Sequence, residues 1–94
     1  MTGELVSIRD ICNNPEIFMG VIGVGDEKYI KSVYLLLKEV CSNIKDKLRP
    51  IIKKKIEQKY IVKSEDGRYF AFVKKDKYVT VVDITYVIKD ILGE

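Results

Sequence analysis

The sequence predicts one α+β domain over residues 1–94, with a five-stranded antiparallel sheet that carries a long helix on one face and two short helices on the other. Three observations lead to this fold class. The 94 residues, 47% hydrophobic and 33% charged, suffice for one packed core and are too few for two domains. The apolar spacing is helical from Val33 to Ile51 and becomes alternating after Tyr60. Turn residues then separate the alternating segments.

A short helix is expected at the start of the chain, over Leu5–Cys12, where the apolar residues recur at helical spacing. Thr2 is its candidate N-cap. The segment Asn13–Pro15 ends it, because the residue before a proline disfavours the helical conformation.

Two strands are predicted next. Ile17–Val24 is rich in strand-forming residues, and Gly20 and Gly23 would each cost a helix about 1 kcal/mol relative to alanine. A turn at Gly25–Lys28 then leads to a return strand over Tyr29–Val33, which makes a hairpin. The same residues of the return strand could instead begin the following helix.

The long helix is predicted from Val33 to about Gln58. Its apolar residues are three or four positions apart, as one face of a helix requires; they are Val33, Leu37, Val40, Ile44, Leu48 and Ile51. Pro50 lacks a backbone donor, so it is expected to kink this helix or to be the first residue of a new one.

Three strands and a closing helix follow. The strands are predicted at Tyr60–Lys63, Arg68–Lys74 and Lys77–Ile84, with turns at Ser64–Gly67 and Lys75–Asp76. Arg68–Lys74 is apolar on both faces, which favours a central strand covered on both sides. The last helix covers Tyr86–Leu92, with Thr85 or Asp83 as its cap and Gly93 at its end. The predicted element order is α-β-β-α-β-β-β-α.

The two cysteines, Cys12 and Cys41, are predicted to be buried free thiols, since so few cysteines make neither a disulfide framework nor a zinc site. Free thiols fit a reducing compartment. The sequence contains neither a secretory signal nor an apolar run long enough to span a bilayer, so a cytoplasmic, non-membrane protein is expected. The lysine- and isoleucine-rich, amide-poor composition is typical of a thermophilic source.

The chain offers little catalytic chemistry. It contains no histidine, and its serines lie in no nucleophile motif. Gly20 and Gly25 have the spacing of a phosphate-binding loop, but Asp26 and Glu27 stand where that motif needs lysine and serine or threonine. We therefore expect no enzyme activity, no catalytic, cofactor-binding or metal-binding residue and no cofactor, and a role in binding other macromolecules.

A basic cluster lies between Cys41 and Lys59. It holds seven basic residues against Asp46 and Glu57, namely Lys45, Lys47, Arg49, Lys53, Lys54, Lys55 and Lys59. Charge of one sign on a helical segment can attract an acidic partner or nucleic acid. The alternative is a solvated helix end, in which the cations oppose the helix dipole.

The element order and local features resemble the roadblock/LC7 family, which is related to the longin and profilin-like folds. The matching segments are LVSIRDICNNPEIFMGVIGV, the long helix from Val33, and YIVKSEDGRYFAFVKKDKYVTVVDI followed by TYVIKDIL. The turn at Gly25–Lys28 departs from the acidic-glycine pair that is common in the family, and the basic end of the long helix is a local addition.

The resemblance implies a homodimeric adaptor or scaffold that binds and regulates a small Ras-like GTPase, as bacterial and archaeal relatives do. Carried over, the dimer interface comprises Tyr34, Leu37, Cys41, Tyr60, Ile61 and Val62. The residues expected to contact the GTPase are Lys38, Lys45, Arg49 and Lys53.

The alternative interpretation is a small basic nucleic-acid-binding protein of the winged-helix type. Its helices would come first, the Asp66–Gly67 hairpin would be the wing, and the basic segment would contact phosphates. The two interpretations differ over residues 17–33. The roadblock fold needs paired strands there, whereas a winged helix needs a helix or an isolated strand.

Overall fold

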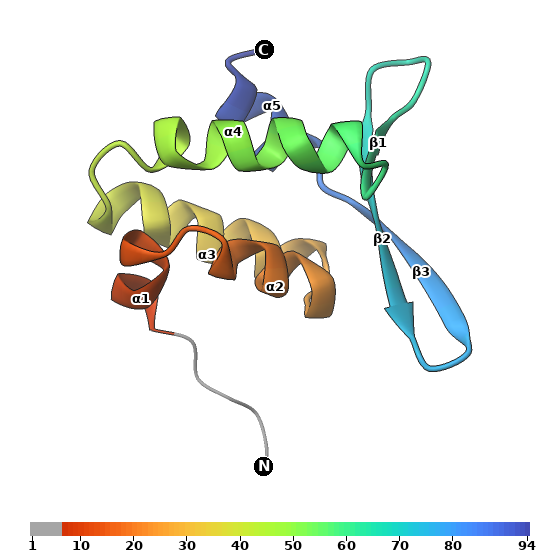
Figure 1. Cartoon of the computed structure of the whole chain (residues 1–94), viewed down its shortest axis with the longest axis horizontal. Coiled ribbons are helices and arrows are strands. Elements are labelled where there is room, and N and C mark those ends of the chain that lie inside the picture. Colours follow the sequence, from red (N-terminus) through yellow and green to blue (C-terminus); the bar gives the residue numbers. More distant parts are fainter. Residues whose placement is uncertain (1–6) are drawn as a thin grey trace.

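The computed structural model describes residues 7–94 apart from the side chain of Lys75, and these residues form five helices and a three-stranded antiparallel sheet (Figure 1). The elements, in chain order, are α1 (Ile8–Asn13), α2 (Ile17–Val24), α3 (Glu27–Val40), α4 (Ile44–Glu57), β1 (Ile61–Lys63), β2 (Tyr69–Lys75), β3 (Tyr78–Asp83) and α5 (Thr85–Leu92). The α+β class is therefore confirmed, and the predicted five-stranded sheet is wrong. The expected N-cap Thr2 and the expected helix start Leu5 lie outside the described residues.

The helices gather on one side of the molecule and the sheet flanks them, with the β2–β3 hairpin projecting past the helices (Figure 1). The chain packs α1 against α3, α2 against β2, and α4 against both α5 and β1. One cluster of buried side chains runs through all of these contacts, from Ile11 to Ile91. The core thus fixes the helices to one face of the sheet.

Ile17–Val24 is helix α2, not a strand. Phe18, Val21 and Ile22 are buried, at the i, i+3, i+4 spacing of a helix face. Gly20 and Gly23 fall on the exposed side, where an added Cβ would meet nothing within 4 Å. Burial of the apolar face therefore outweighs the low helix propensity of the two glycines.

The predicted return strand Tyr29–Val33 is also wrong, because these residues belong to α3. Asp26 caps this helix, with its side chain accepting a hydrogen bond from the Tyr29 N–H at 2.8 Å. Gly25 precedes the cap, and a Cβ there would lie 2.4 Å from the Tyr29 ring. A side chain at position 25 would therefore force the Tyr29 ring to shift, and glycine avoids this clash.

The predicted long helix is divided into two. The break lies at Cys41–Asn43, where Asn43 has a left-handed conformation with φ 59°. Asparagine tolerates this conformation better than most residues. Pro50 lies inside α4, on its exposed side, and does not end it.

The sheet has the order β1-β2-β3. Its three strands and both predicted turns are confirmed, with Gly67 at φ 87° and Asp76 at φ 53° in the turns. β2 is central as predicted, but only one face is covered. Tyr69 and Val73 are buried against the helices, while Phe72 on the opposite face is 47% exposed.

Cys12 and Cys41 form a disulfide, so the expectation of two free thiols is wrong. Their Cα atoms are 5.5 Å apart, which is within the usual range for a disulfide. The bond joins the end of α1 to the residue after α3. The closing helix α5 is confirmed, and Gly93 ends it at φ 80°. Its N-cap position is Ile84, not Thr85 or Asp83 as predicted, although the Asp83 carboxylate accepts a hydrogen bond from the Thr85 N–H at 2.9 Å.

Candidate functional site

Helix α4 presents basic residues to solvent because its opposite face is anchored in the core. Ile44, Leu48 and Ile52 are buried. Their spacing leaves four lysines exposed on the remaining surface, and we call these residues the α4 lysine surface: Lys45, Lys47, Lys53 and Lys54. Amphipathic packing therefore converts a basic sequence segment into a basic surface.

The α4 lysine surface keeps much of its charge free. Among residues 7–94, the ion pairs join Lys38 to Asp90, Arg49 to Asp46 and Arg68 to Asp83, and none involves these four lysines. Lys47 Nζ donates a 3.4 Å hydrogen bond to the Cys12 carbonyl. The nearby acid Asp46 is already neutralised by Arg49 at 2.7 Å.

Three of the predicted partner-binding residues surround the C-terminal end of α5. Lys38 Nζ donates to Asp90 at 2.8 Å, and Arg49 Nε donates to the Ile91 carbonyl at 3.1 Å. Lys45 also acts electrostatically on Asp90. Lys38 and Arg49 thus hold α5 in place, while Lys53, further along α4, is exposed.

The carboxylate of Asp90 is the centre of this arrangement. The hydrogen bond from Lys38, followed by that from the Tyr34 hydroxyl, lowers the pKa of Asp90. The same contact with Asp90 raises the pKa of Lys38. Sequence reasoning missed this network because Asp90 is more than fifty residues from both partners.

The lysine surface lies on the second helix of a consecutive pair, and α3 and α4 run in nearly opposite directions (Figure 1). The connection Cys41–Asn43 joins α3 to α4, and α4 leads through a short turn into β1. A second helix that follows such a turn and precedes antiparallel strands is the element that a winged-helix protein directs at DNA. The lysines lie on that second helix.

The sheet adds basic residues away from α4. Lys74, near the end of β2, and Lys77, in the turn before β3, are exposed on the projecting hairpin. Lys63 on β1 is exposed as well, and its ammonium lies 5.5 Å from the centre of the Tyr69 ring. Lys63, Lys74 and Lys77 lie on the sheet and are not part of the α4 lysine surface.

The predicted dimer-interface residues are mostly in the core of the single chain. Tyr34, Leu37, Cys41 and Ile61 are buried within it. Val62 is partly exposed, and Tyr60 is exposed beneath the ammonium of Lys55, 5.1 Å from the ring centre. Of the six, only these last two present side-chain surface to a partner.

Among residues 7–94, no group of three or more histidine, cysteine, aspartate or glutamate side chains is arranged to hold a metal ion. Over the same residues, no helix has the length and apolar character needed to cross a bilayer. Comparisons with models of known protein families, with curated proteins and with solved structures found no match.

Proposed function

We propose that this protein binds duplex nucleic acid through α4. The observation that carries the proposal is the α4 lysine surface, four lysines that form no ion pair with the described residues 7–94, on a helix that follows α3 and precedes the antiparallel strands. Phosphate contacts by lysine supply most of the affinity of sequence-independent binding, and a helix of this kind fits the major groove of B-DNA.

The roadblock fold requires paired strands over residues 17–33, and the chain has the helices α2 and α3 there. The strand pairing that the resemblance implied is therefore absent from these residues. The GTPase-adaptor role was inferred from that resemblance alone. The winged-helix interpretation requires a helix or an isolated strand at this place, and the helices α2 and α3 are compatible with it.

A cytoplasmic location accords with this role. A disulfide is unusual in the cytosol of mesophiles, but intracellular proteins of hyperthermophiles are rich in disulfides. The disulfide is thus compatible with both the proposed location and the thermophile-like composition.

The first test is binding of fluorescent duplex DNA, measured by anisotropy at increasing salt concentration. The charge-reversal variant Lys53→Glu/Lys54→Glu should bind more weakly than the wild type. Log affinity falls as log salt rises, and each lost phosphate contact makes this slope less steep by about 1. The slope of the double variant should therefore be less steep by about 2.

The matched control is Lys28→Glu/Lys89→Glu, which changes the net charge equally at exposed positions on α3 and α5. It should keep most of the wild-type affinity. Absence of binding by the wild type at low salt would refute the proposal. An equal loss in both double variants would assign the binding to overall charge and not to α4.

A further inference from the structure

One edge of the sheet is open for pairing. Strand β3 lies at the end of the order β1-β2-β3 and pairs only with β2 among the described residues. The Ile84 N–H, just after β3, donates to the Tyr69 carbonyl at the end of β2. Since successive N–H groups in a strand alternate in direction, those of Val79 and Val81 point away from β2.

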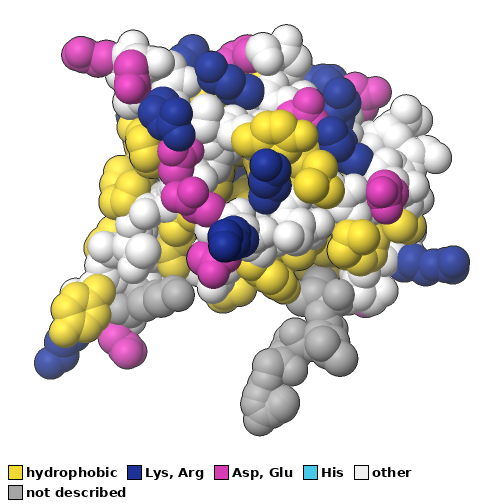
Figure 2. All heavy atoms as spheres, turned by 180° about the vertical axis from the view of Figure 1, so that it is seen from behind, with side chains coloured by type: hydrophobic (Ala, Val, Ile, Leu, Met, Phe, Trp, Pro, Cys, Tyr) yellow, Lys and Arg dark blue, Asp and Glu magenta, His cyan; other side chains and the backbone are white. Residues whose placement is uncertain are grey.

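This edge lacks the features that normally prevent pairing with another chain. The five residues from Tyr78 to Val82 include no charge and no proline. Three of them are exposed and apolar, with Tyr78 at 74%, Val79 at 62% and Val81 at 53%. Hydrophobic side chains also lie along the side of the molecule from which the hairpin projects (Figure 2).

We propose that β3 pairs antiparallel with β3 of a second copy, which joins two sheets into one of six strands. The twofold axis passes beside Thr80. Val79 then lies opposite Val81 of the second copy, and the N–H and C=O groups of both pairs form four new hydrogen bonds. This pairing does not depend on whether α4 binds nucleic acid.

Charge at the ends of the strand selects this register. With Thr80 opposite its own copy, Lys77 of one chain lies opposite Asp83 of the other. Glu27 stands beside Asp83, with its Oε1 accepting from the Asp83 N–H at 3.3 Å. Arg68 already pairs with Asp83, so Asp83, Glu27 and Arg68 together leave one net negative charge for Lys77 of the other chain. A shift that centres the pair on Val81 would place Lys77 opposite the uncharged Thr85.

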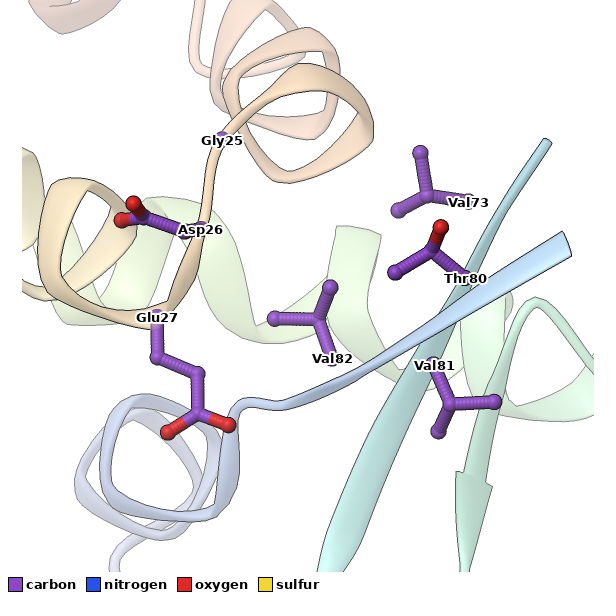
Figure 3. Close-up of a pocket in the computed structure, with 7 residues that line it drawn as sticks. All are labelled: Gly25, Asp26, Glu27, Val73, Thr80, Val81 and Val82. Atoms are coloured by element: carbon purple, nitrogen blue, oxygen red, sulfur yellow. The ribbon is translucent and has the colours of Figure 1, made fainter. Parts of the chain in front are cut away.

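A cleft beside the edge accommodates the second copy. It has a volume of about 220 Å³ and lies between the α2–α3 junction and the strands (Figure 3). Val73, Thr80 and Val82 point towards the junction, and Val81 points away from it. In the proposed register Tyr78 of the second copy lies opposite Val82, so its ring would enter this cleft.

The first test is the mass in solution, measured by light scattering after size-exclusion chromatography at rising protein concentration. The wild type should be a dimer. Val81→Pro removes only an outward-pointing donor and should be a folded monomer by circular dichroism. Val40→Lys, at an equally exposed site on α3, should remain dimeric.

A crosslinking test fixes the register, because Thr80 of each chain would form a directly opposed, non-hydrogen-bonded pair. Thr80→Cys should give a covalent dimer on oxidation, and Val81→Cys should give much less. A monomeric wild type, or a dimer that Val81→Pro leaves intact, would overturn the proposal. Preferential crosslinking through Val81→Cys would overturn the register.

Discussion

At the scale of single residues, Asp90 connects two helices through one oxygen atom. Its Oδ2 accepts from the Tyr34 hydroxyl at 2.7 Å and from Lys38 Nζ at 2.8 Å. Burial, and then the hydrogen bond to Asp90, raise the pKa of Tyr34, so its hydroxyl stays protonated and remains a donor. Because Tyr34 is fully buried, the network satisfies a polar atom inside the core.

The variant Asp90→Asn tests this network. It should lower the free energy of unfolding at neutral pH by about 1–2 kcal/mol, since hydrogen bonds to a charged group are lost. The pKa of Asp90 is lowered by folding, so its contribution is complete above the unfolded-state value of about 4 and is lost as pH falls through the folded-state value. Urea unfolding should therefore show the two proteins converging in acid. The control Glu65→Gln, at an exposed position, should match the wild type throughout.

At the scale of elements, the strands after Tyr60 and the first helix, α1, were predictable, whereas the helical conformation of residues 17–33 was not. In β1–β3, the alternation and the turn residues agree, and local sequence decides the conformation. In α2, the two glycines argue for a strand, while the spacing of Phe18, Val21 and Ile22 argues for a helix. Contacts with β2, distant in sequence, decide between them.

Glycine-to-alanine substitutions in and after α2 separate two effects on the free energy of unfolding, namely helix propensity and steric packing. Gly20→Ala and Gly23→Ala should each raise the free energy of unfolding by about 0.5–1 kcal/mol, because alanine favours the helix and both sites are open. Gly25→Ala should be destabilising, since its Cβ would lie 2.4 Å from the Tyr29 ring and 3.1 Å from the Val21 carbonyl oxygen. Chemical denaturation measures all three. A loss of stability in the first two variants would contradict the exposed placement of these glycines.

At the scale of the whole molecule, the basic character of residues 45–59 was visible in the sequence. Which of the predicted partner-binding cations are exposed and which contact α5 was not. Lys53 is exposed as predicted, whereas Arg49 and Lys38 are engaged by α5. That difference depends on where α5 packs, and no local pattern encodes it. The disulfide was missed for the same reason, because packing of α1 on α3 brings Cys12 to Cys41.

The disulfide holds the N-terminal helix to the rest of the fold. Helix α1 has six residues, too few to be stable alone, and the bond closes a loop with a sequence separation of 29. A loop of this size implies a stabilisation of about 3–4 kcal/mol. Reduction should therefore lower the melting temperature by more than about 10 °C for a chain of this length.

The comparison that isolates the bond is thermal unfolding of the wild type and of Cys12→Ser, each with and without a reductant. The variant should unfold near the temperature of the reduced wild type and should not respond to reductant. Hydrogen exchange should then show the largest loss of protection in α1, where Ile11 is the buried residue. If reduction leaves the wild-type melting temperature unchanged, packing of Ile11 alone holds α1, and the bond adds no stability.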